Sequence, residues 1–309
     1  MRILRVKSFK FKSKKVKLKK KQHKKSVILF VIALAMAVFF MLPTVLTIAN
    51  SFMSPQEIKA NYGMIFNDKE SAGYISEKVN LKFIPDMVTF KQFTTVLLNS
   101  PEYLLKFWNT VIYTVPILVV QVIIAILAAY SFTRFKGRIK EILFFVYIIL
   151  MLLPYQVTLV PNYLVTDWLG LLDTKWAIWL PGMTSPFSVF LFTKFMRRIP
   201  ESLIEAAKID GAGEWQIFSK ICVPLCKGAM VSVSILIFID YWNMVEQPLI
   251  LLKNEDMHPL SVFLSKINSG EISLAFAVAT IYMVPGILIF LYGEEYLVEG
   301  ISYSGGLKG

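Results

Sequence analysis

The sequence predicts an all-α polytopic membrane protein with six transmembrane helices and both termini in the cytoplasm. Three observations lead to this prediction: the apolar composition, a series of long apolar runs, and the distribution of Lys and Arg. Of the 309 residues, 56% are hydrophobic and the mean hydropathy is +0.59. A soluble globular protein of this length is less apolar, so the composition indicates several membrane-spanning segments.

The first 25 residues form a basic tail with 13 Lys or Arg and no acidic residue. The formal net charge is +12, so the rest of the chain is close to neutral. Because an apolar run follows directly, we expect residues 1–25 to lie against the anionic cytoplasmic leaflet rather than to bind nucleic acid. Such a tail needs no fold of its own, and the predicted transmembrane domain occupies residues 26–309.

Six apolar segments are long enough to cross a bilayer. The first, residues 26–49, carries no charge and exceeds the apolar part of a typical signal peptide. The others follow at about 109–130, 142–161, 177–196, 229–247 and 274–293. Prolines interrupt four of them, at positions Pro116, Pro154, Pro181, Pro186 and Pro285. Lipid tolerates interrupted helices where neighbours or a water-filled cavity satisfy the freed backbone groups, so these prolines indicate a transporter with a central pathway.

The positive-inside rule orients these segments. With the N-terminus in the cytoplasm, 24 of the 33 Lys and Arg residues fall on the cytoplasmic side and nine on the outer side. The outer segment at about 50–107 holds six basic and six acidic residues, and its part near 90–105 has helical apolar spacing. It could be a docking surface for an extracellular partner or a simple connector.

A polar stretch between two apolar runs, residues 200–225, predicts two short helices outside the bilayer. Pro200 suits a first helical position, and Gly211 suits the left-handed residue that ends a helix. Apolar residues share one face of each piece, and Pro224 ends the second. The apolar positions are Leu203, Ile204 and Ala207 in the first piece, and Ile217, Phe218, Ile221 and Cys222 in the second.

The acidic residues of this stretch are badly placed for an isolated element. Glu201 and Glu205 are like charges four residues apart, and Asp210 lies near a helix C-terminus, where the dipole disfavours a carboxylate. A basic partner surface would remove both costs, so we expect these side chains to be unpaired within the chain itself. The alternative is a solvated loop whose charges bind no partner.

Asp240 is the ionisable residue that lies deep within a predicted span. A carboxylate there should face the bundle interior or a cavity. Its neighbours Tyr241, Trp242 and Asn243 combine flat apolar faces with hydrogen-bonding groups, which is the chemistry that binds pyranose rings. An interfacial aromatic belt with a locally paired aspartate explains the same residues equally well.

The sequence carries no P-loop of the G-x-x-x-x-G-K-[ST] type, so energy for uphill transport must come from a partner or an ion gradient. Cys222 and Cys226 could share a helix face, but His23 and His258 are remote from them. Packing is therefore the better explanation for the two cysteines than a metal site.

Several motifs resemble one transporter family. Glu205-Ala206-Ala207, Asp210-Gly211, Ile221 and Pro224 are similar to the EAA loop of ABC importer permeases, although Val223 and Gly228 stand where Leu and a second Pro are common. Residues 153–161, 169–174, Trp242-Asn243 with Pro248-Leu249, and residues 296–301 with 306–309 resemble segments of maltose-type inner permeases of carbohydrate importers. Glu294 and Glu295 depart from this pattern, which often has Gln and Arg there.

The resemblance implies the type I permease fold of ABC importers and a place in the cytoplasmic membrane. The chain would be a transport subunit without enzymatic activity that moves a carbohydrate, in particular an oligosaccharide, by alternating access. The implied partners are a second permease, an ATPase dimer that holds ATP and Mg, and an extracytoplasmic solute-binding protein; the chain itself would bind no cofactor.

The resemblance also implies roles for individual residues. The loop at about 197–228 would couple the chain to the ATPase through Glu201, Glu205, Ala206, Ala207, Asp210, Gly211, Ile221 and Pro224. The substrate pathway would include Tyr155, Gln156, Asp240, Tyr241, Trp242 and Asn243. Three alternatives stay open: an ABC permease for another solute such as a glycerol phosphate ester, an ion-coupled secondary transporter that uses Asp240, and a membrane scaffold.

Overall fold

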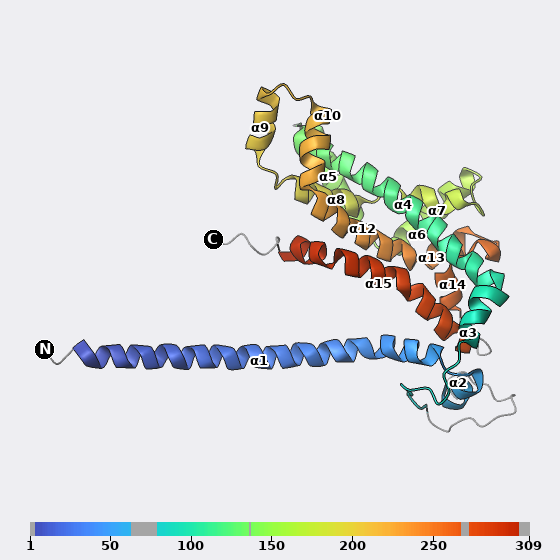
Figure 1. Ribbon diagram of the computed structural model, residues 1–309. Coiled ribbons are helices and arrows are strands. Elements are labelled where there is room, and N and C mark those ends of the chain that lie inside the picture. Colours follow the sequence, from blue (N-terminus) through green and yellow to red (C-terminus); the bar gives the residue numbers. More distant parts are fainter. Residues whose placement is uncertain (1–3, 63–78, 136, 267–271, 303–309) are drawn as a thin grey trace. The chain divides into compact units, whose positions relative to one another are not determined.

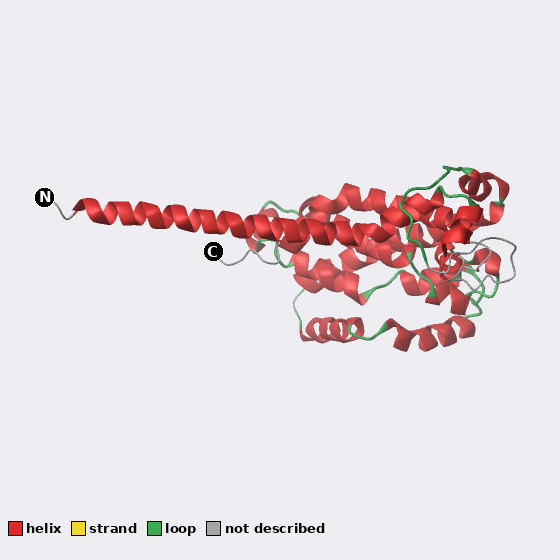
Figure 2. Cartoon of the chain, turned by 90° about the horizontal axis from the view of Figure 1, so that it is seen from below, coloured by secondary structure: helices red, strands yellow, loops and turns green. Residues whose placement is uncertain are grey.

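The computed structural model describes residues 4–62, 79–135, 137–266 and 272–302, and every regular element in these ranges is a helix (Figures 1 and 2). The all-α prediction is therefore confirmed for the described part of the chain. Two compact units are present, Met1–Thr89 and Phe90–Gly309, and each is considered by itself.

The first unit contains the long helix α1 (Leu4–Ser51) and the short helix α2 (Pro55–Tyr62). The α1 backbone is helical through the basic tail, from Leu4 onwards. Lysine has a good helix propensity, and a formed helix gains one hydrogen bond for each residue it adds. The Asn50 amide donates to the Tyr62 hydroxyl at 2.8 Å, and Lys82 Nζ lies 3.0 Å from a Glu57 carboxylate oxygen.

The second unit is organised around α4 (Pro101–Arg134), which follows the short turns α3 (Lys91–Thr94) and η1 (Thr95–Asn99). These turns confirm the helical spacing predicted near residues 90–105. The remaining elements are α5 (Arg138–Met151), α6 (Tyr155–Trp168), α7 (Lys175–Gly182), α8 (Pro186–Met196), α9 (Glu201–Ile209), α10 (Glu214–Ile217), η2 (Phe218–Cys222), α11 (Val223–Leu225), α12 (Lys227–Trp242), α13 (Glu246–Leu251), η3 (Glu255–Met257), α14 (Leu260–Ser265) and α15 (Ile272–Ser302). Helix α4 packs against α7, α8, α12 and α14, and α12 also packs against α15 (Figure 1).

Among the described helices, three are long and apolar enough to cross a membrane: Val27–Ser51 within α1, Pro101–Arg134, and Ile272–Tyr296 within α15. Two bent pairs raise this number to five if each pair is one span. The first joins Arg138–Met151 to Tyr155–Trp168 at 105°, and the second joins Glu214–Leu225 to Lys227–Trp242 at 72°. Six crossings therefore stay a prediction.

Some of the predicted prolines lie at helix boundaries, whereas others lie inside continuous helices. Pro154 lies between α5 and α6, and Pro186 begins α8 after a break from α7, as predicted. Pro116 and Pro285, however, lie inside the unbroken helices α4 and α15, so the prediction that they interrupt their helices was wrong. Close packing by neighbouring helices can stabilise such a helix despite the hydrogen bond that its proline removes.

The Pro101 end of α4 is fixed by hydrogen bonds to the segment around η3. The Asn109 amide donates to the carbonyls of Asp256 and His258 at 2.6 and 3.2 Å. Asp173, the described non-glycine residue with a positive φ (60°), accepts the backbone N–H groups of Lys253 and Asn254 at 2.9 Å each. The 169–174 motif is therefore joined to the 253–254 backbone through the Asp173 carboxylate.

Candidate functional site

Residues 201–225 form a helix–turn–helix element, called the 201–225 element below. Helix α9 begins after Pro200, as predicted to within one residue. Gly211 has a φ of +79°, which confirms the predicted left-handed residue after α9. Three hydrogen bonds close the turn: Asp210 N–H to Ala206 O, Gly211 N–H to Lys208 O, and Ala212 N–H to Ala207 O. The chain then reverses into α10.

The second half of this element is packed into the core. Ile217, Phe218 and Cys222 are buried and share a hydrophobic cluster with residues of α4, α8 and α12, and Ile221 packs against its edge. Helix α9 contributes Ile204 to the same cluster, with Ala207 half-buried beside it. The predicted apolar face of the second piece is thus correct, whereas in the first piece the predicted Leu203 is exposed. Helix α9 has a single buried side chain and α10–η2 has three.

A polar link joins α4, α9 and α10. The Tyr130 hydroxyl, near the end of α4, donates to the carboxylate of Glu214, the first residue of α10, and lies 3.2 Å from its carbonyl oxygen. Lys208 of α9 forms an ion pair with the same carboxylate, with Nζ 2.9 Å from Oε1. The ammonium of Lys208, and then the hydroxyl of Tyr130, hold the pKa of the Glu214 carboxyl below its usual value. The sequence patterns did not reveal this link, because its members come from three separate elements.

The outward surface of the 201–225 element is exposed. Glu201, Glu205 and Asp210 are exposed and form no ion pair with any described residue, as expected. Beside them, Ile209 is 85% exposed and Trp215 is 70% exposed. The sequence patterns singled out neither side chain. The exposure of Ile209 could have been predicted, because it follows Ile204 by five positions and so falls off its helix face. Trp215 could not, because its spacing to Phe218 and Cys222 would place it on the buried face.

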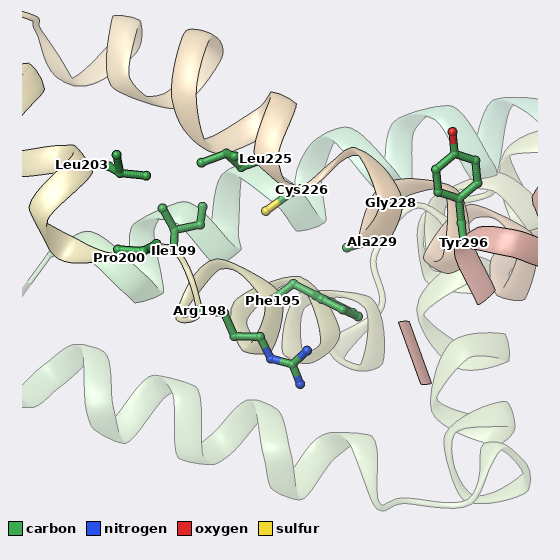
Figure 3. A pocket seen from close by; sticks show the side chains of 10 residues that line it. All are labelled: Phe195, Arg198, Ile199, Pro200, Leu203, Leu225, Cys226, Gly228, Ala229 and Tyr296. Carbon is green, nitrogen blue, oxygen red and sulfur yellow. The ribbon is translucent and has the colours of Figure 1, made fainter. Parts of the chain in front are cut away.

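The other predicted coupling residues lie as follows. Ala206 and Pro224 are exposed, in α9 and α11, and Gly211 is exposed in the turn. The prediction that Pro224 ends the second piece was wrong: it lies inside α11 (Val223–Leu225), in the first turn, where its missing N–H removes no intrahelical hydrogen bond. A mostly apolar cleft of about 370 Å³ lies between this element and the ends of neighbouring helices (Figure 3). It is lined by Phe195, Arg198, Ile199, Pro200, Leu203, Leu225, Cys226, Gly228, Ala229 and Tyr296.

A second candidate site lies where α12 ends. Asp240 is in the last turn of α12, two residues before Trp242 ends the helix, and its depth within a membrane span stays a prediction. A carboxylate at this end opposes the helix dipole at a cost of about 0.3–1 kcal/mol, and no described residue forms an ion pair with it. Asp240 lines two adjoining cavities of about 530 and 460 Å³, which share Ile239, Asp240 and Tyr241.

These cavities bring together most of the predicted pathway residues. The larger one is lined by Tyr155, Ile239, Asp240, Tyr241, Asn243, Met244, Val245, Glu246 and Gln247. The smaller one is lined by Gln121, Ser185, Phe187, Ser188, Val233, Leu236, Ile237, Ile239, Asp240 and Tyr241. Sequence reasoning missed Gln121, Glu246 and Gln247; a glutamine inside the apolar run of α4 was a signal for the first.

Two predicted pathway residues lie elsewhere. Trp242 is 4% exposed and packs between Phe238 and Tyr282, with ring centroids 4.9 and 5.4 Å away. Its indole N–H donates to the Tyr282 carbonyl at 3.2 Å, so it joins α12 to α15 instead of lining a cavity. Gln156 is exposed on α6 and lines neither cavity.

Comparison with protein families settles what kind of protein carries these sites. A family model described as "Binding-protein-dependent transport system inner membrane component" matches residues 121–303, more than half of the chain. The chain belongs to this family. As an inner membrane component of this transport family, the protein is a transport subunit rather than an enzyme. The matched range includes the 201–225 element and both cavities.

Individual relatives agree with this assignment. The inner membrane component is 28% identical over 236 residues to the arabinooligosaccharides transport system permease protein AraQ of Halalkalibacterium halodurans, covering 75% of this chain and 84% of that one. It is also 28% identical over 199 residues to the sn-glycerol-3-phosphate transport system permease protein UgpE of Brucella melitensis, covering 63% and 71%.

Two solved structures share the fold. A bacterial ABC transporter involved in the import of the acidic polysaccharide alginate matches with a TM-score of 0.72 at 22% identity, over 88% of this chain and 95% of that one. The alginate ABC transporter in complex with an alginate pentasaccharide-bound periplasmic protein matches with a TM-score of 0.58 at 16% identity, over 88% and 94%. The described helices thus have the fold of an ABC importer permease.

Proposed function

We propose that this chain is one of two permease subunits of an ATP-driven ABC importer that moves a carbohydrate, in particular an oligosaccharide, across the cytoplasmic membrane. The arabino-oligosaccharide relative and the cavities lined by hydroxyl, amide and carboxylate groups support this cargo. The other components would be a second permease, an ATPase dimer that holds ATP and Mg, and an extracytoplasmic solute-binding protein, such as the one in the related alginate complex.

The observation that carries the proposal is the surface of the 201–225 element. It combines three carboxylates that form no ion pair with a described residue with four exposed large apolar side chains, of which Ile209 and Trp215 are the most exposed. Exposed aromatic and aliphatic anchors beside unpaired charges are the usual components of a protein-docking surface. We infer that a basic groove of the ATPase receives this surface and that its movement drives alternating access.

A charge reversal tests the coupling. Glu205→Lys should lower ATP-dependent uptake by the complete transporter about tenfold or more, because a cation would face the basic groove. Co-purification of the ATPase should fall in parallel, while insertion of the permease into the membrane stays normal. Trp215→Ala should weaken co-purification by removing an apolar anchor.

The matched control is Glu141→Lys, which makes the same charge change on an exposed residue of α5. It should leave uptake and co-purification unchanged. If Glu205→Lys also transports normally and retains its ATPase, the 201–225 element does not couple the two subunits.

The glycerol-3-phosphate relative favours a second candidate cargo, a glycerol phosphate ester. It requires the same partners and the same coupling. The ion-coupled alternative instead predicts uptake by this chain alone that an uncoupler abolishes, whereas an ABC importer needs its ATPase and continues while ATP lasts. Membership in a binding-protein-dependent family favours the ABC mechanism.

A further inference from the structure

The two adjoining cavities at the end of α12 are acidic. Asp240 lines both of them, and Glu246 lines the larger one. Neither Lys, Arg nor His is among their described lining residues. No described residue forms an ion pair with Asp240 or Glu246, so both carboxylates are left without a neutralising partner.

Along the chain, no basic residue lies within twelve positions of Asp240 on either side. Lys227 and Lys253 each lie 13 positions away. Along α12, this separation from Lys227 corresponds to about 20 Å, because a helix rises about 1.5 Å per residue. At that distance screening by salt leaves little attraction, since the Debye length is about 8 Å at physiological ionic strength. The described lining residues include no basic side chain to offset Asp240 and Glu246, so these two carboxylates give the cavities a negative potential.

Buried hydrogen-bond acceptors point to the kind of solute that fits. Gln121 is 2% exposed and lines the smaller cavity; its amide N–H donates to the Ser188 hydroxyl at 2.7 Å, which leaves its carbonyl oxygen without a donor. In the larger cavity, the Gln247 carbonyl oxygen and the Tyr155 hydroxyl are also buried without a hydrogen-bond partner among the described residues. Unpaired buried polar groups are costly, so these groups favour a ligand that both donates and accepts hydrogen bonds, as sugar hydroxyls do.

We propose that these cavities accept polyhydroxylated solutes and reject anionic ones. This inference rests on the proposed function and names its substrate class. Sugar hydroxyls donate to the carbonyl oxygens of Gln121 and Gln247 and to the Asp240 carboxylate. A phosphate ester or a uronate brings additional acceptors and a negative charge, which the two carboxylates repel. A neutral oligosaccharide therefore fits, and a glycerol phosphate ester or an acidic polysaccharide does not.

The test measures solute binding to the purified complex of both permeases and the ATPase, without the solute-binding protein, whose own selectivity would otherwise contribute. The probes are a neutral arabino-tetraose, a uronate tetrasaccharide of equal length and glycerol 3-phosphate. The neutral sugar should raise the melting temperature at lower concentration than either anion, by about tenfold, which corresponds to about 1.4 kcal/mol.

Two substitutions identify the residue responsible. Asp240→Asn keeps the size and removes the charge, and should reduce the preference for the neutral sugar over the anions. Asp240→Lys should reduce it further. Glu255→Lys, on exposed η3 and outside both cavities, is the matched control and should leave the preference unchanged.

The inference is overturned if an anion stabilises the wild-type complex more than the neutral sugar does. It is also overturned if Asp240→Lys leaves the preference as it was. Either result leaves the proposed coupling intact where uptake still requires the ATPase. Conversely, uptake without the ATPase contradicts the proposed function, whatever solute is preferred.

Discussion

At the scale of single residues, the Tyr130–Glu214–Lys208 link makes the 201–225 element sensitive to acid. The lowered pKa of Glu214 means that its carboxylate is stabilised in the folded protein by Lys208 and Tyr130. A lowered carboxyl pKa adds stability above the unfolded-state value, and this stability is lost as the pH falls through the lower, folded value. The link therefore weakens only at acidic pH.

We predict that hydrogen exchange in residues 201–217 accelerates as the pH is lowered from about 6 to about 3, with a midpoint below the ordinary Glu pKa of about 4.3. Glu214→Gln should abolish this step after correction for the intrinsic pH dependence of exchange. The stability change at neutral pH should stay within about 1 kcal/mol, because both side chains are close to half exposed.

Glu201→Gln is the control, since Glu201 is exposed and forms no ion pair with a described residue. If the pH step persists in Glu214→Gln and disappears in Glu201→Gln, the titrating carboxyl group is that of Glu201, and the prediction for Glu214 is wrong.

The sequence predicted the role of a residue where that role depends only on its own segment of the chain. Gly211 was predicted because a left-handed residue after a helix is a local requirement. The environment of Trp242 was not, because its stacking on Tyr282 joins positions 40 residues apart. The donors and acceptors around Asp240 come from α4, α6, α12 and α13, so no spacing along the chain reveals them.

At the scale of elements, the turn after α9 determines how α9 and α10 are placed. Gly211 has a φ of +79° and open space around the position of a Cβ atom. A substitution there acts through backbone strain and not through a clash. The cost for an L-residue in this conformation is about 1–2 kcal/mol.

We predict that Gly211→Ala lowers ATP-dependent uptake several-fold and that Gly211→Asn lowers it less, because Asn tolerates this conformation better. Gly213→Ala is the matched control: this neighbouring glycine has a φ of −74° and also has open space around it. The ratio of solute transported to ATP hydrolysed measures the effect. Equal losses in Gly211→Ala and Gly213→Ala would show that the turn conformation is unimportant.

The prolines show how far elements can be predicted. Pro154 and Pro186 mark helix boundaries, where a missing N–H costs nothing. Pro116 and Pro285 have the same chemistry but lie within continuous helices. Whether a proline ends a helix depends on the packing of the surrounding helices, which the local sequence does not contain.

At the scale of the whole molecule, topology is the property that the charge distribution predicts. We expect both termini and the 201–225 element on the cytoplasmic side and the η3 segment on the outer side. The two native cysteines, Cys222 and Cys226, are 0% and 3% exposed, so they give little background in thiol labelling.

Two exposed positions test this topology. Gln216→Cys should react with an impermeant thiol reagent only in inside-out vesicles, and Glu255→Cys only in right-side-out vesicles. Labelling of both variants from the same side would contradict the predicted orientation.

The unequal anchoring of the 201–225 element has a mechanical consequence. Helix α9 is held by one buried side chain and one ion pair, whereas α10–η2 is embedded by three buried side chains. We therefore expect α9 to be the more compliant half of the element. We expect a force applied to α9 to reach the core by two routes, through the short 197–200 connection to α8 and through α10–η2, which packs with α4, α8 and α12.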